Sequence, residues 1–188
     1  ADRNEPVGDT IARMASLPLD EHPGERWIYG YNTDILGAVI EKASGMDLNS
    51  FLKQEIFEPL GMIDTHFYLP EEKKGRLATV YRPKASGGIE ARHETNGMQS
   101  QGMYDNGPRV SFSGGAGLLS TASDYAKFLQ MTLNGGQFNG ERLLSPKTIE
   151  LMTTNHLGDI PFRSGTGFGL GFSVVTDLGK RGSLGSVG

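Results

Sequence analysis

Apolar side chains recur every three or four residues in several stretches of the chain, a spacing that puts them on one face of a helix. The pattern predicts helices at residues 9–16, 33–44 and 48–57, and two more that begin after Thr121 and Ser145. Residues 167–176 instead alternate and are rich in Phe and Val, which indicates a strand. Helices fill the first three quarters and a strand comes only near the end, so we expect an α+β protein.

The helix predicted at residues 33–44 has the clearest pattern. Its apolar positions, opposite Glu41 and Lys42, are Ile35, Leu36, Val39, Ile40 and Ala43. Gly45 follows, and glycine readily adopts the left-handed conformation that ends a helix. The next helix is expected to begin at Asp47 and to stop at Pro59, because proline cannot continue the backbone hydrogen bonds.

Cap signals also delimit the helix that follows Thr121. Residues 121–124 resemble a capping box with Asp124 in its last position, and Gly135 should end the helix that they open. Upstream, residues 66–112 mix short apolar runs with Gly, Pro and Asn. We expect loops with a few short strands in that segment.

Two dipeptides predict a hairpin and a helix start in the last third of the chain. Asn139-Gly140 is typical of a two-residue hairpin turn. Ser145 offers a side-chain cap, and Pro146 suits the first position of a helix.

Composition narrows the class of protein. The 188 residues are 37% hydrophobic and 21% charged, as in an ordinary soluble domain. The net charge of -4, without a basic run, argues against nucleic acid and anionic membranes as partners. No apolar run approaches the roughly 20 residues of a membrane span. The localisation, whether cytoplasmic, periplasmic or secreted, is left open.

Neither a metal nor a cofactor is predicted. The chain has no cysteine, so it offers no thiol nucleophile. Its four histidines lack the short paired spacing of a zinc site and are His22, His66, His93 and His156.

A tyrosine occupies a turn just before the helix at residues 33–44. The stretch reads Pro-Gly-Glu-Arg-Trp-Ile-Tyr-Gly-Tyr-Asn-Thr-Asp-Ile-Leu-Gly over residues 23–37. A phenol titrates near pH 10, so Tyr29 can act as a base near neutral pH only where adjacent cations favour the phenolate. A tyrosine held in this way is a candidate for acid-base catalysis.

A second stretch, Ser-Gly-Gly-Ala-Gly-Leu-Leu-Ser-Thr-Ala-Ser-Asp-Tyr, lies at residues 113–125. With the tyrosine turn, it resembles the serine beta-lactamase and penicillin-binding-protein superfamily, and is most similar to family VIII carboxylesterases and class C beta-lactamases. The resemblance runs through most of the chain. It implies residues 1–188 as part of one domain, with a helical part to about residue 160 and entry into a helix-flanked antiparallel sheet from about residue 165.

The resemblance also implies a mechanism. In that family a serine attacks an acyl carbonyl, a lysine one helical turn later keeps the serine reactive, and a tyrosine shuttles the proton. Tyr29 matches the tyrosine as the catalytic residue. Tyr31 stands where an asparagine is common, which implies a substrate-binding position that favours esters over beta-lactams. The implied substrates are small-molecule esters, amides or beta-lactams.

Plainer interpretations stand beside these. Tyr29 could pack half-buried beside Trp27, and Tyr31 could be a simple packing residue instead of a pocket wall. The glycines at residues 114–117 are expected to permit a close backbone approach.

Two sequence patterns imitate motifs of the resembled family. Ser50 and Lys53 satisfy Ser-x-x-Lys, but they follow Tyr29, so we interpret them as a solvated helix face. Residues 164–167, Ser-Gly-Thr-Gly, imitate a Lys-Thr-Gly motif without its cation.

In the resembled family the nucleophilic serine lies upstream of the tyrosine, and only 28 residues precede Tyr29 here. The chain therefore looks like the middle of an enzyme and should be inactive on esters when alone. Two alternatives remain open at this point. The chain could be a non-catalytic fragment that serves as a binding or regulatory module, or a complementary chain that carries the Ser-x-x-Lys motif could complete the site.

Overall fold

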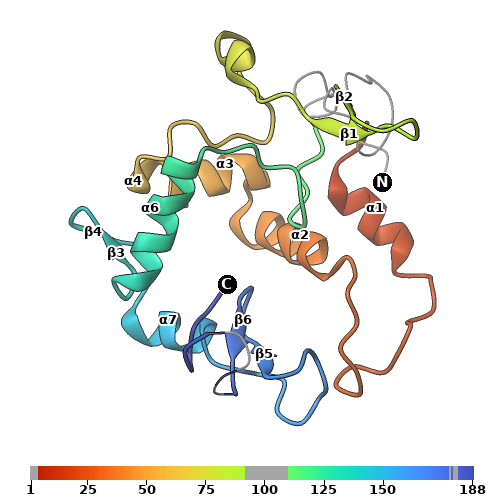
Figure 1. Ribbon diagram of the computed structural model, residues 1–188, viewed down its shortest axis with the longest axis vertical. Helices are drawn as coiled ribbons and strands as arrows, with labels where there is room; N and C mark the ends of the chain where they lie inside the picture. The colour runs from red at the N-terminus through yellow and green to blue at the C-terminus, as the bar shows by residue number, and fades with distance from the viewer. Residues whose placement is uncertain (1–3, 92–109, 178, 180–181) are drawn as a thin grey trace. The chain divides into compact units, whose positions relative to one another are not determined.

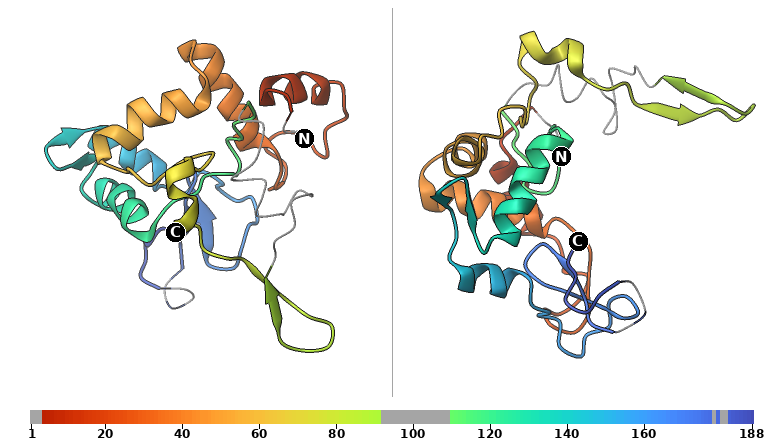
Figure 2. Two further views of the ribbon diagram at one scale, coloured as in Figure 1. Left: turned by 90° about the horizontal axis from the view of Figure 1, so that it is seen from above. Right: turned by 60° about the vertical axis from the view of Figure 1, so that its left-hand side comes forward.

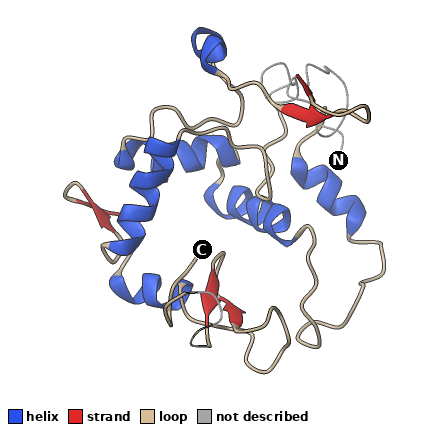
Figure 3. Cartoon of the chain, in the orientation of Figure 1, coloured by secondary structure: helices blue, strands red, loops and turns tan. Residues whose placement is uncertain are grey.

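The fold was analysed in a computed structural model that describes residues 4–91, 110–177, 179 and 182–188. The chain divides into two units, each of which is described by itself. The first takes in Ala1–Ser16, Tyr31–Glu58 and Met62–Asp124, and the second Leu17–Gly30, Pro59–Gly61 and Tyr125–Gly188. Helices and short two-stranded antiparallel sheets make up the described regular structure (Figures 1 and 3). The predicted α+β class is confirmed.

The first unit begins with two helices that contact each other. Helix α1 spans Val7–Met14 and α2 spans Asn32–Ser44, so both predicted helices are present within two residues of their expected bounds. Gly45 ends α2 in the left-handed conformation with φ 72°, as its position predicts. The Glu5 carboxylate holds the Arg13 side chain of α1 in an ion pair.

The next helix differs from its prediction at Pro59. Helix α3 (Leu48–Leu52) runs on through a π-helical turn, η1 (Lys53–Phe57), into α4 (Glu58–Leu60), as the ribbon in Figure 2 shows. The expectation that Pro59 stops the helix is therefore wrong. The wider turn ahead of Pro59 carries the chain past the carbonyl with which a proline ring clashes in a regular helix, so one more turn forms. Asp47 caps α3 as predicted, since its carboxylate accepts from Ser50 N at 2.9 Å.

The core of the first unit forms where α2, α3 and two loop segments meet. Leu48, Phe67 and Tyr68 are buried, and Ile40, Leu52 and Phe112 pack against them. The rings of Phe67 and Phe112 lie 5.3 Å apart between centroids. Each side chain of this size contributes about 1.5–3 kcal/mol when it is fully buried.

The apolar side of α2 is wider than the face that this core covers. Gly37 is buried and Ile40 packs on the core, whereas Ile35, Leu36 and Val39 are 42%, 56% and 55% exposed. The hydrophobic pattern located the helix, but only part of its apolar side packs within the unit.

Between the core segments lie a short helix and a hairpin. The 3-10 helix η2 spans Glu71–Arg76, and the hairpin pairs β1 (Tyr81–Pro83) with β2 (Ile89–Ala91), Tyr81 opposite Ala91. The expectation of loops with short strands holds for the described part of this segment, although η2 was not predicted. Residues 92–109 lie outside the described residues.

Helix α6 spans Ala122–Leu133 and begins where the capping signal places it. The Thr121 hydroxyl accepts from Asp124 N at 3.2 Å. The Asp124 side chain, expected to act as a charge at the helix start, is only 2% exposed. Its carboxylate accepts from Asp64 N at 2.7 Å and from the Thr65 hydroxyl at 3.2 Å, so it ties α6 to a loop sixty residues earlier.

The rest of the second unit contains the predicted hairpin and helix. Strands β3 (Gln137–Phe138) and β4 (Glu141–Arg142) flank Asn139 and Gly140, whose φ angles of 48° and 90° suit a type I′ turn. Helix α7 spans Pro146–Met152, and its Ser145 cap accepts from Thr148 N at 3.0 Å.

The last predicted strand is wrong in one respect, because residues 167–176 form a hairpin instead of a continuous strand. Strand β5 (Thr166–Phe168) pairs with β6 (Ser173–Val175), with Gly167 opposite Val174. The chain reverses at Gly169–Phe172, where Gly169 N donates to Phe172 O at 2.7 Å and Gly171 has φ 89°. Gly169 and Gly171 do not interrupt the alternating pattern of the sequence, yet in the structure they form the turn.

Candidate functional site

A turn at residues 22–25 comes four residues before Tyr29, within the second unit. Glu25 N donates to His22 O at 3.2 Å, with Pro23 and Gly24 between them. Gly24 has φ 91°, the sign that the third position of a type II turn requires. The sequence therefore forms this turn through Pro-Gly chemistry.

An aromatic cluster then fixes Trp27, two residues before Tyr29. Its ring centroid lies 4.6 Å from Phe162 and 4.5 Å from Phe168, and these two rings lie 5.5 Å apart. The Arg163 guanidinium lies 5.1 Å from the Phe162 ring centroid. Contacts of this kind contribute about 0.5–1.5 kcal/mol per ring pair beyond the area that they bury.

Tyr29 itself is 90% exposed. The interpretation of Tyr29 as a half-buried side chain beside Trp27 is therefore wrong, since the partners of Trp27 are Phe162 and Phe168. An exposed phenol on an anchored backbone can be reached by another reacting group. This arrangement is compatible with the predicted catalytic role and does not test it.

Tyr31 is the N-cap residue immediately before α2, in the first unit. It is 56% exposed, and its carbonyl accepts from Ile35 N at 3.0 Å. Its side chain makes no capping hydrogen bond. Only Gly30 separates Tyr31 from Tyr29 along the chain, although the two tyrosines belong to different units.

A loop from the second predicted motif lies against the first turns of α2. A methyl group on Gly114 would lie 2.1 Å from Thr33 O, and one on Gly37 would lie 3.3 Å from the Gly114 Cα. A methyl group on Gly115 would lie 2.6 Å from the Asp34 carboxylate. The expected structural role of these glycines, a close backbone approach, is what the contacts show.

Polar contacts hold the same loop in place. The Ser113 hydroxyl donates to the Asp34 carboxylate, which also accepts from Gly115 N at 3.4 Å. The Ser113 oxygen accepts from Gly115 N at 3.2 Å and Ala116 N at 3.0 Å. We call Asp34 and residues 113–116 the Asp34 clamp. Asp34 carries no local signal in the sequence, because its partner Ser113 lies 79 residues away.

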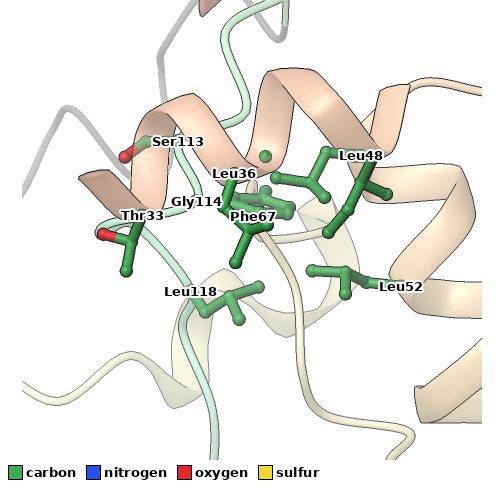
Figure 4. A pocket seen from close by; sticks show the side chains of 10 residues that line it. Thr33, Leu36, Leu48, Leu52, Phe67, Ser113, Gly114 and Leu118 are labelled. Atoms are coloured by element: carbon green, nitrogen blue, oxygen red, sulfur yellow. The ribbon is translucent and has the colours of Figure 1, made fainter. Parts of the chain in front are cut away.

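A hollow of about 140 Å³ lies beside the clamp in the first unit. Its lining is mostly apolar, and Leu36, Leu48, Leu52, Phe67 and Leu118 converge on it from α2, α3 and two loops (Figure 4). Thr33, Ser113 and Gly114 lie at one end.

The residues of the two stretches that imitate family motifs make other contacts in the structure. The Ser50 hydroxyl donates to Asp47 at 2.6 Å, and the Lys53 ammonium lies 3.7 Å from Glu58. Both side chains are thus engaged with carboxylates in the way that an ordinary helix surface shows. In the Ser-Gly-Thr-Gly stretch, Thr166 is a residue of β5 and pairs with Val175.

The strongest charge cluster of the described residues lies on the segment that leads into η2. Asp64 accepts a two-pronged contact from Arg76 at 2.7 and 2.8 Å, and Lys73 lies 2.9 Å away. The Arg76 and Lys73 hydrogen bonds hold the pKa of the Asp64 carboxyl well below its usual range. Burial, with Lys73 nearby, lowers the pKa of His66.

Within the described part of the chain, no three His, Asp or Glu side chains gather as a metal site would need. No helix in that part is long and apolar enough to cross a membrane.

Fold and motifs together define a beta-lactamase-like protein, and the comparison with known families agrees. The model of the Beta-lactamase family matches residues 1–188, so the chain belongs to that family. Proteins and solved structures similar to this chain include an esterase and a penicillin-binding-protein homologue.

Particular relatives are similar along most of the chain. An uncharacterised protein of Mycobacterium tuberculosis is 36% identical over 179 residues, which are 90% of this chain and 43% of that protein. The lovastatin esterase of Penicillium rubens is 33% identical over 79% of this chain and 35% of its own length. The structure of EstCE1, a hydrolase with promiscuous acyltransferase activity, is 25% identical and superposes with a TM-score of 0.76 over 95% of this chain and 49% of that one. This chain thus spans about half the length of such relatives or less.

Proposed function

We propose that this chain is the tyrosine-bearing part of a serine hydrolase that works through an acyl-enzyme, and that Tyr29 moves the proton. The observation that carries the proposal is the Tyr29 phenol of a Beta-lactamase family member, 90% exposed two residues after Trp27, whose ring packs on Phe162 and Phe168. Anchoring and access are both needed for a group that must meet a substrate in one geometry.

The chemistry runs in two halves. With a cation from the remainder of the site to favour the phenolate, Tyr29 takes the proton from a serine hydroxyl while the serine oxygen bonds to the acyl carbon. The tetrahedral intermediate then breaks its bond to the leaving group, and the Tyr29 hydroxyl gives the proton to that alkoxide or amine. Water attacks the acyl-serine by the same route, which releases the acid and restores the serine.

We place the nucleophile outside residues 1–188. In the one Ser-x-x-Lys of this chain, the serine hydroxyl donates to Asp47 and the lysine lies beside Glu58 on an exposed helix surface, so the two side chains are directed to other partners. The relatives are about twice as long as this chain, which gives room for a serine and lysine elsewhere. That serine is supplied by the rest of a longer protein or by a complementary chain.

We favour esters as substrates over amides and beta-lactams. Tyr31, 56% exposed at the start of α2, presents an aromatic ring where a beta-lactamase commonly has an amide side chain. Two similar proteins, the lovastatin esterase and EstCE1, carry names that describe ester or acyl chemistry. An alcohol that replaced water in the second half would turn the same chemistry into acyl transfer.

Replacing Tyr29 by Phe in the longer protein tests the proposal. We expect kcat/KM for p-nitrophenyl acetate to fall by on the order of 10²–10⁴, the usual loss for a general acid-base. The unfolding midpoint should stay unchanged, because the Tyr29 side chain is largely exposed. Tyr81→Phe is the matched control, since Tyr81 is also exposed and lies on β1. Wild-type activity in Tyr29→Phe would sink the proposal, because the chemistry would then proceed without Tyr29, and residues 1–188 would be better explained as a non-catalytic part of the protein.

A further inference from the structure

The start of α2 is held by a distant loop instead of by its own cap. Tyr31 makes no side-chain capping bond at this end of the helix. Asp34, three residues later in the first turn, receives the Ser113 hydroxyl and the Gly115 amide. The first turn of α2 is therefore fixed to residues 113–116 through one carboxylate.

The loop on the other side of this contact is itself rigidly made. Ser113 folds the loop back by accepting from Gly115 N and Ala116 N. Gly114 touches the Thr33 carbonyl so closely that even a methyl group would not fit. A shift of the Asp34 carboxylate would break its hydrogen bonds to Ser113 and Gly115.

From these contacts we infer that Asp34 is a positioning residue for Tyr29. The inference rests on the proposed function. Asp34 fixes the helix start, Tyr31 is the residue at that start, and two peptide bonds join Tyr31 to Tyr29. The Asp34 clamp thus acts on Tyr29 along the chain, through Tyr31 and Gly30.

A different role for the same residues, Ser113 as nucleophile with Asp34 as base, is disfavoured by the contacts. Two backbone amides donate to the Ser113 oxygen. They occupy the lone pairs that an attack would use and make the oxygen less nucleophilic. The hydrogen bond between Ser113 and Asp34 therefore holds the loop in place.

The test compares kcat in four forms of the longer protein with p-nitrophenyl acetate as the probe: wild type, Asp34→Ala, Tyr29→Phe and the double variant. We expect Asp34→Ala to lower kcat at least about tenfold with KM little changed, since small misplacements of a reacting group cost that much or more. In the Tyr29→Phe background, Asp34→Ala should cost nothing further, because the group that it positions is gone.

Ser113→Ala gives the same test without touching the helix. It should lower kcat as Asp34→Ala does, and Ser113→Thr, which keeps the hydroxyl, should restore most of the loss. Asp47→Ala is the matched structural control, because Asp47 also accepts a serine hydroxyl and an amide at a helix start in the same unit. Its kcat per folded molecule, counted by fluorophosphonate titration, should stay at the wild-type value.

Three results would overturn the inference. They are an unchanged kcat in both Asp34→Ala and Ser113→Ala, an equal fall of kcat with and without Tyr29, and a loss in Asp47→Ala as large as that in Asp34→Ala. Failure of the proposed function appears separately, as full activity of Tyr29→Phe alone.

Discussion

The Asp64 carboxylate makes the stability of the fold depend on pH. Arg76 and Lys73 both bind its carboxylate and hold the pKa of that carboxyl below its ordinary value. The unfolded chain, with an aspartate pKa of about 3.9, takes up the proton first as the pH falls. The stabilisation is therefore complete above about pH 5 and is lost progressively below about pH 4.

We expect Asp64→Asn to lower the thermal unfolding midpoint at pH 7, and the gap from the wild type to be narrower at pH 3, where the loss of this stabilisation has begun. Unfolding curves at the two pH values check this. Glu90→Gln is the control, because the pair of Glu90 and Arg82 is exposed on a hairpin and such pairs contribute little. A gap between Asp64→Asn and the wild type that stays the same at pH 3 and pH 7 would show that the carboxylate does not stabilise the fold through its charge.

Individual residues were predictable where their role is local. Gly45, Asp47 and Ser145 lie at helix ends and do there what their side chains, or the lack of one, dictate. Asp34 and Asp124 could not be assigned in this way, because their partners lie 79 and sixty residues away. The exposure of Tyr29 could not be predicted either, because Trp27 packs against Phe162 and Phe168. These two rings lie more than 130 residues downstream.

At the scale of elements, the close contact between α2 and the loop at residues 113–116 can be tested by mutation. We expect Gly114→Ala to destabilise the protein by about 1–3 kcal/mol, the usual cost of overpacking, because its methyl group would meet the Thr33 carbonyl. Gly8→Ala is the control, since a methyl group there meets nothing within 4 Å and α1 gains helix propensity.

Urea unfolding of the two glycine variants gives both free energies. A Gly114→Ala protein as stable as the wild type would mean that the loop and helix do not approach as described. A large loss in Gly8→Ala would show that glycine replacements in this protein are costly for reasons other than space.

The elements themselves were mostly predictable, because caps and turns report on their own neighbourhood. The helix through Pro59 and the hairpin at residues 166–175 were not. In the first case a π-helical turn makes room for the proline, and in the second a glycine-rich turn is hidden in a run of alternating residues. Both depend on backbone geometry that a hydrophobic pattern does not encode.

At the scale of the whole molecule, two observations stand together: the match to the family and the exposed apolar side of α2. The chain matches the Beta-lactamase family along its length but spans about half of similar proteins. Leu36 and Val39 of α2 are more than half exposed in the unit. The prediction of one partial domain over residues 1–188 stays a prediction.

The most direct measurement labels the longer protein with a fluorophosphonate and maps the modified serine by peptide mass spectrometry. We predict a single labelled serine outside these 188 residues, with labelling slowed in Tyr29→Phe and unchanged in Tyr81→Phe. A label on Ser50, Ser113 or another serine of this chain, or labelling that is indifferent to Tyr29, would contradict the assignment of this chain as the tyrosine-bearing part of a serine hydrolase.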